Sequence, residues 1–77
     1  MQGTLFRPPR RLKIPPGRFS RAWRLGWNTA DYATQSGAPL GDPHQYAKSI
    51  MYHFGRPEKE IPQFVSGVAA NLAMRAK

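Results

Sequence analysis

The sequence contains no cysteine among its 77 residues. That absence excludes a disulfide framework and any metal site with thiolate ligands. A chain of this size buries only about 60% of the surface that it exposes when unfolded, so its core is small. With no disulfide to compensate, the sequence predicts that a partner supplies part of the stability.

Carboxylates are also scarce, since the chain has only four. Asp31 is expected on the polar side of a helix and Asp42 at a helix start, and Glu58 and Glu60 are expected to be solvated charges in a connector. Four acids placed in this way offer little for general acid–base catalysis. The acids therefore give no support for an enzyme.

The histidines and glycines add no catalytic signal. His44 and His53 stand nine positions apart on one predicted helix and point in different directions, so they cannot share a metal as an i, i+4 pair would. The glycines form neither a P-loop nor a dinucleotide-binding fingerprint. The sequence therefore predicts a protein that is not an enzyme, with no cofactor, no metal site and no small-molecule substrate.

Long apolar runs are missing as well. No stretch approaches the roughly 20 apolar residues that are needed to cross a bilayer. The best candidate, residues 61–76, is interrupted by Gln63, Ser66, Asn71 and Arg75. This stretch predicts an amphipathic or buried helix.

What the chain does have is positive charge, and most of the excess lies at its start. Residues 1–25 carry seven cations and no acid, whereas residues 26–77 carry five cations against four acids. Proline pairs at 8–9 and 15–16 favour extended backbone, so residues 1–17 are predicted to form an extended basic arm. Such an arm suits phosphates, lipid headgroups or an acidic protein surface, and the alternative is a solvated, disordered tail. The candidate anion-binding or partner-binding residues of the arm are Arg7, Arg10, Arg11, Lys13, Arg18, Arg21 and Arg24.

Beyond the arm, residues 18–77 have helical periodicity and no sustained period-two alternation, so the predicted fold class is all-α. Three short helices are expected, at about 18–35, 43–54 and 62–76, with little independent core. Asp42 is suited to cap the second helix. The fold expected from the sequence is a small helical region that follows the arm.

Aromatic residues are plentiful, with nine in a chain too short to enclose all of them. Large aromatics that a small core cannot cover usually mark an interface, although they can also simply form the core. A further alternative is that Arg21 and Arg24 act with Trp23 as a stacking platform for bases. The candidate interface aromatics are Phe19, Trp23, Trp27, Tyr46, Phe54 and Phe64.

These observations favour a non-catalytic structural accessory subunit of a large multi-subunit assembly, with other protein subunits as its partners. The acid-free, arginine-rich start resembles a mitochondrial import signal in composition. We therefore expect a mitochondrial energy-transducing complex, respiratory or ATP synthase, with the chain peripheral to the inner membrane. The alternative is a small ribosomal or mitoribosomal protein whose arm binds rRNA phosphates. A third possibility is a peptide that lies on anionic lipid.

Overall fold

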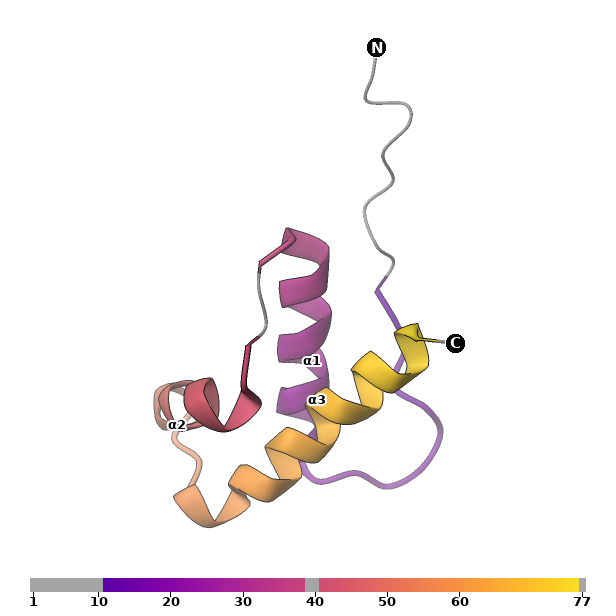
Figure 1. The fold of residues 1–77 in the computed structure, drawn as a ribbon. Helices are drawn as coiled ribbons and strands as arrows, with labels where there is room; N and C mark the ends of the chain where they lie inside the picture. The colour runs from indigo at the N-terminus through magenta and orange to yellow at the C-terminus, as the bar shows by residue number, and fades with distance from the viewer. Residues whose placement is uncertain (1–10, 39–40, 77) are drawn as a thin grey trace.

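The computed structural model describes residues 11–38 and 41–76, and this part consists of helices and connecting segments without any strand (Figure 1). In chain order, the elements are α1 (Arg21–Ser36), α2 (Pro43–His53), the short 3-10 helix η2 (Glu58–Glu60) and α3 (Ile61–Arg75). The predicted all-α class is confirmed. Residues 1–10, which include the candidate cations Arg7 and Arg10, lie outside the described residues.

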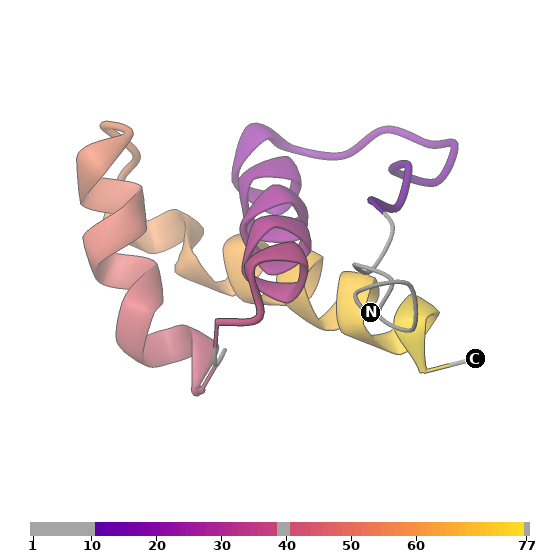
Figure 2. The ribbon, with the colours of Figure 1, turned by 90° about the horizontal axis from the view of Figure 1, so that it is seen from above.

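The described elements are arranged along α3. Figure 2 shows α2, α1 and residues 11–20 following one another across the length of α3. Both α1 and α2 pack against α3, and the α1–α3 packing is the more extensive. Residues 11–20, called the N-terminal segment below, pass the C-terminal half of α3 and turn back to the start of α1 (Figure 1).

The first helix begins at Arg21, three residues later than the sequence predicts. Ser20 is extended, with φ −66° and ψ 163°, and its hydroxyl oxygen accepts a hydrogen bond of 3.2 Å from the backbone N–H of Trp23. This side-chain cap satisfies one of the N–H groups that have no partner within the helix. Phe19, two positions before Arg21, therefore lies outside the helix.

The start of α2 agrees with the sequence prediction. The carboxylate of Asp42 accepts a hydrogen bond of 3.0 Å from the N–H of His44, and Pro43 occupies the first turn. The connector that follows contains η2, an element that was not predicted from the sequence. Helix α3 then begins at Ile61, directly after η2.

The core lies where α1 crosses α3, and two glycines make the crossing close. A Cβ atom added at Gly26 would lie 1.9 Å from the carbonyl oxygen of Phe64, and one added at Gly67 would lie 2.0 Å from that of Trp23. Both neighbours are backbone atoms, so neither position has room for a side chain. The buried apolar side chains of the core, including two from α2, are Ala22, Trp27, Ala30, Ala47, Met51, Phe64 and Val68.

Candidate functional site

A buried polar cluster joins the N-terminal segment to both long helices. Its centre is Asp31 on α1, which is only 2% exposed. One carboxylate oxygen accepts hydrogen bonds from the backbone N–H of Leu12 at 3.1 Å and from the side-chain amide of Asn71 at 3.3 Å. The guanidinium of Arg75 donates to that same oxygen, and Nε of Arg11 lies 3.4 Å from the other. The expectation that Asp31 lies on the polar side of the helix is wrong, because this residue is buried.

Further hydrogen bonds order the groups around this carboxylate. Asn71 also donates to the carbonyl oxygen of Trp27 at 3.3 Å and accepts from Nε of Arg75 at 2.7 Å. Burial raises the pKa of Asp31, but the hydrogen bonds from Leu12, Asn71 and Arg11 and the charge of Arg75 outweigh that effect. The pKa of Asp31 is therefore held below its ordinary value, and the carboxylate stays charged at neutral pH.

Aromatic stacking provides a second attachment of the N-terminal segment. The rings of Phe19 and Trp23 stack with their centroids 3.8 Å apart and their planes 13° apart. The ring of Trp23 in turn lies 5.4 Å from that of Trp27. The indole N–H of Trp27 donates a hydrogen bond of 3.0 Å to the carbonyl oxygen of Leu12. These contacts pack the start of the segment and its end against α1.

Three surface hollows meet at Asn28, which lies in the middle of α1. One hollow lies between α1 and the N-terminal segment, where Arg11 and Lys13 line it. A second is bounded by Arg11 and Tyr32, and the third lies between α1 and the end of α2. Because Asn28 lines all three, they form one continuous surface. We call this surface the basic–aromatic face and define it by Arg11, Lys13, Leu25, Asn28, Tyr32, Ile50 and Phe54.

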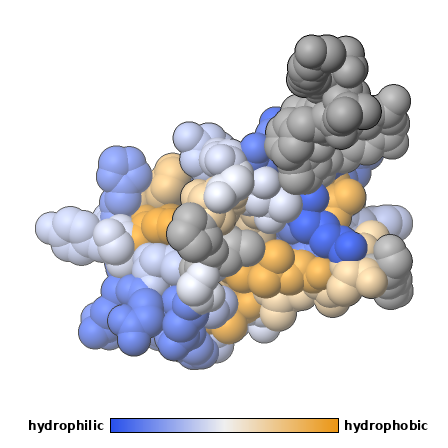
Figure 3. All heavy atoms as spheres, turned by 45° about the horizontal axis from the view of Figure 1, so that its top comes forward, coloured by the Kyte–Doolittle hydropathy of each residue, from blue (hydrophilic) through white to orange (hydrophobic). Residues whose placement is uncertain are grey.

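The third hollow, between α1 and α2, is the apolar part of this face. Leu25 and Ile50 are half-buried in it, whereas Tyr32 is 75% exposed and Phe54 is 58% exposed. On the face of the molecule drawn in Figure 3, apolar areas lie directly beside strongly hydrophilic ones. Exposed apolar side chains that adjoin charged groups are typical of a surface that binds another molecule.

A second surface with few charges lies on α3. No charged residue occurs from Ile61 to Met74. Ala69 and Ala73 lie exposed on its outer side with Leu72 between them, which is 36% exposed. We call this the α3 outer face, and its small side chains would allow another chain to approach closely.

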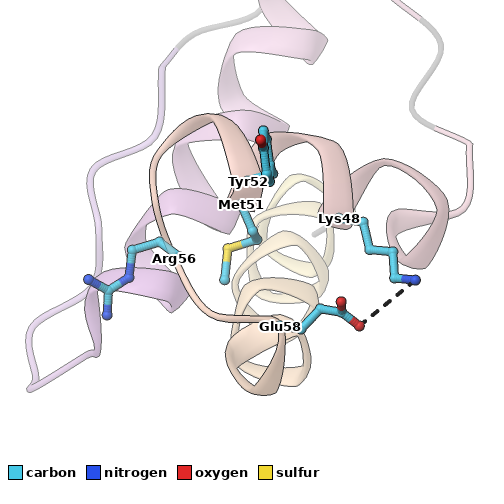
Figure 4. A pocket seen from close by; sticks show the side chains of 5 residues that line it. All are labelled: Lys48, Met51, Tyr52, Arg56 and Glu58. Carbon is cyan, nitrogen blue, oxygen red and sulfur yellow. Dashed lines mark ion pairs between the residues drawn. The ribbon is translucent and has the colours of Figure 1, made fainter.

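The hollow drawn in Figure 4 is lined by charged side chains of α2 and of the connector that follows it. The ammonium group of Lys48 and the carboxylate of Glu58 reach toward one another at 3.8 Å, while Arg56 points away from that pair. Arg56 instead forms two hydrogen bonds with Glu60, of 2.8 Å and 2.7 Å, which raise the pKa of the arginine and lower that of the glutamate. The Arg56–Glu60 pair connects the turn after α2 to the start of α3, and the Lys48–Glu58 pair connects α2 to η2.

The candidate interface aromatics fall into different environments. Trp27 and Phe64 are fully buried within the chain, so the prediction that they contact a partner is wrong. Their helical spacing is compatible with a face that the chain itself buries as well as with a face that a partner covers. In the structure both side chains pack where α1 crosses α3. Phe19, Trp23 and Tyr46 are half-buried, and Phe54 is exposed.

Sequence reasoning missed the two aromatics that are most exposed in the described part of the chain. Tyr52 is 87% exposed and Tyr32 is 75% exposed, yet neither was among the candidates. Both lie off the apolar stripe of their helix, and that position indicated that their side chains would be exposed.

The candidate cations are only partly brought together. Arg11 lies beside Asp31 and, with Lys13, borders the basic–aromatic face. Arg18, Arg21 and Arg24 are exposed at and before the start of α1. Arg24 precedes Asn28 by one helical turn, which places its charge on the same side of α1 as the face.

Within the described ranges, no three histidine, aspartate or glutamate side chains lie close enough to hold a metal ion. The helices in these ranges are also too short or too polar to span a membrane. No known protein family, curated protein or solved structure matches the chain.

Proposed function

We propose that this chain is a non-catalytic structural accessory subunit of a larger multi-subunit assembly. The observation that carries the proposal is the exposure of large apolar side chains on all three long helices of the described part. Exposed groups of this kind lower solubility unless a partner covers them. They are Tyr32, Tyr52, Phe54, Leu72 and Met74.

Protein subunits fit these surfaces better than nucleic acid does. The α3 outer face offers no charge to a phosphate backbone, and the α1–α2 hollow is lined largely by apolar side chains. RNA-binding surfaces draw much of their affinity from cations placed along phosphates. An uncharged helix face is instead suited to close packing against another protein chain.

For the setting, we propose a mitochondrial energy-transducing complex, respiratory or ATP synthase, with the chain peripheral to the inner membrane. The support comes from the sequence, whose first 25 residues combine seven cations with no acid. Subcellular fractionation of the native host checks this part separately from the structural role.

Binding to rRNA is the second candidate, and the exposed cations favour it. Lys13, Arg18 and Arg24 are exposed, and in the described part none of them lies within 4.0 Å of a carboxylate. Cations of this kind are available to phosphates. In this alternative the assembly is a ribosome, and the N-terminal segment lies between RNA strands.

Native purification at low and high salt, with and without nuclease, tests both candidates. A protein-bound subunit stays in a large particle after nuclease treatment and in about 1 M salt, where the Debye length falls to about 3 Å. Release by nuclease, together with ribosomal RNA in the untreated particle, would replace the first candidate with the second. Migration of the native chain as a free monomer would contradict both.

A charge placed on the α3 outer face tests whether another protein chain covers this face. Ala69→Glu introduces a carboxylate beside Leu72 and should release the chain from the particle, because a buried unpaired charge is unfavourable. Gln63→Glu adds the same charge to an exposed position on another side of α3, and it should leave assembly intact. Circular dichroism of both variants verifies that the helices are retained.

A further inference from the structure

We propose that the basic–aromatic face binds an acidic, amphipathic helix of a neighbouring protein subunit, an inference that rests on the proposed function and names the partner of this surface. The apolar side chains of that helix would enter the hollow between α1 and α2. Its carboxylates would lie across Asn28, next to Arg11 and Lys13.

The hollow supplies the apolar half of the match. Leu25 and Ile50 form its inner wall, and the exposed rings of Tyr32 and Phe54 stand at its edge. Aromatic and aliphatic side chains at the border of a concave apolar surface are characteristic of sites that hold anchor residues. A partner that buries Phe54 and Tyr32 would remove much of the exposed aromatic surface of α1 and α2.

The positive charge of the face matches the acidic side chains of the proposed partner helix. Arg11 and Lys13 border the hollow beside Asn28, and Arg24 lies one helical turn before Asn28. Asp31 lines the adjoining hollow, but its carboxylate is buried and engaged by Leu12, Asn71 and the two arginines. Since none of the described residues places an exposed carboxylate in the three hollows, their charge is complementary to an acidic ligand.

A helix suits this surface better than an extended peptide. Residues 11–38 and 41–76 contain no strand, so this part of the chain offers no sheet edge to which an extended segment could add. An amphipathic helix carries an apolar stripe on one side and charges along the border of that stripe. The face has the same arrangement, with an apolar hollow on one side of Asn28 and cations on the other.

Site-specific photocrosslinking in the native assembly tests the proposal. Phe54→p-benzoylphenylalanine places a photoreactive ring at the edge of the hollow, and Tyr32→p-benzoylphenylalanine places a second ring across it. Tyr52→p-benzoylphenylalanine is the matched control, because Tyr52 is exposed on α2 but does not line the hollow. Mass spectrometry of the crosslinked peptides identifies the contacted segment and its charge.

We expect positions 54 and 32 to crosslink to one protein segment that has helical apolar periodicity and net negative charge, and position 52 not to reach it. Lys13→Glu turns an attraction into a repulsion and should reduce that crosslink about three- to tenfold at low salt. Lys59→Glu, which makes the same change in η2, should leave the yield unchanged.

Crosslinks to RNA, to lipid or to a segment without net negative charge would overturn the proposal. An equal yield of the same segment from position 52, or an unchanged yield in Lys13→Glu, would also overturn it. Sedimentation of the crosslinkable variants separates this failure from that of the proposed function. A chain that remains in a large particle but gives one of these results refutes the acidic-helix partner alone, whereas a chain that sediments as a free monomer refutes both.

Discussion

The backbone N–H of Leu12 donates a hydrogen bond of 3.1 Å to the carboxylate of Asp31, which is 19 residues away in the sequence. The carbonyl oxygen of Leu12 accepts a bond of 3.0 Å from the indole of Trp27. Both backbone polar groups of Leu12 are therefore bound by side chains of α1. Because these bonds fix where the N-terminal segment lies, they also fix Arg11 and Lys13 beside Asn28.

The first prediction concerns the hydrogen bond from Trp27. Trp27→Phe keeps an aromatic ring in the core but removes the indole donor, so the carbonyl oxygen of Leu12 loses its partner. We expect the free energy of unfolding to fall by about 1–3 kcal/mol, partly from the lost bond and partly from the smaller ring. Hydrogen exchange at the amide of Leu12 should become faster, because the segment detaches more often.

Trp23→Phe is the matched control for that prediction. Trp23 is stacked between Phe19 and Trp27, and its replacement keeps a ring in the stack. Exchange at the amide of Leu12 should then change much less than it does in Trp27→Phe. Equal acceleration in the two variants would mean that the stack, and not the indole hydrogen bond, holds the segment.

The second prediction concerns the charge of Asp31. Asp31→Asn is nearly isosteric but removes the negative charge that the guanidinium of Arg75 contacts in a largely enclosed site. Breaking a buried ion pair on one side typically costs about 3–5 kcal/mol, and the partial exposure of this pair puts our expectation near the lower end. Denaturant unfolding measures the loss, and Asp42→Asn, which alters only a surface cap, should cost about 1 kcal/mol or less.

The third prediction is a pH dependence that follows from the lowered pKa of Asp31. In the unfolded chain this carboxylate titrates near the ordinary pKa of 3.8. The folded state binds a proton there less readily. The contribution of Asp31 to stability is therefore fully present above that value and is lost as the pH falls through the lower pKa of the folded state.

The measurement is the difference in unfolding free energy between the native chain and Asp31→Asn, taken across the acid range. This difference should be constant near neutral pH and should shrink as the pH falls below about 4. Comparing the two chains removes the titration that they share, such as that of Glu60. A difference that did not change with pH would show that the carboxylate contributes through its shape and not through its charge.

Local patterns in the sequence predicted the helices but not the cluster that joins them. The cap at Asp42 depends on neighbouring residues, so the start of α2 was found correctly. The Asp31 cluster instead joins residues up to 44 positions apart, from Asp31 to Arg75, and no local pattern encodes such a pairing. The available signal was that Asp31 lies one turn after Trp27, and Arg75 one turn after Asn71, beside the apolar stripes of α1 and α3.

The aromatic residues illustrate a different limit. The periodicity of Trp27 and Phe64 identifies a helix face but does not distinguish a face that is covered by the chain itself from one that is covered by a partner. The deciding feature is Gly26, whose close approach to another helix no local pattern shows. In the structure this glycine brings α1 close enough to α3 for the chain to enclose both aromatics itself.

The fourth prediction tests that close approach through Gly26→Ala. In an exposed helix this change stabilises by about 1 kcal/mol, because alanine favours the helix more than glycine does. Here the new methyl group would meet the backbone of Phe64, which cannot move unless α3 shifts as a whole. We therefore expect the free energy of unfolding to fall by about 2–3 kcal/mol, in the direction opposite to helix propensity.

Ser66→Ala is the control for the Gly26 prediction, since Ser66 lies on α3 beside the crossing but is exposed to solvent. Its unfolding free energy should stay the same or rise slightly, because alanine is the better helix former. Thermal and denaturant unfolding of the two variants give the comparison. A stabilised Gly26→Ala variant would show that α1 and α3 do not cross at this distance in solution. It would then contradict the conclusion that Trp27 and Phe64 are buried within the chain.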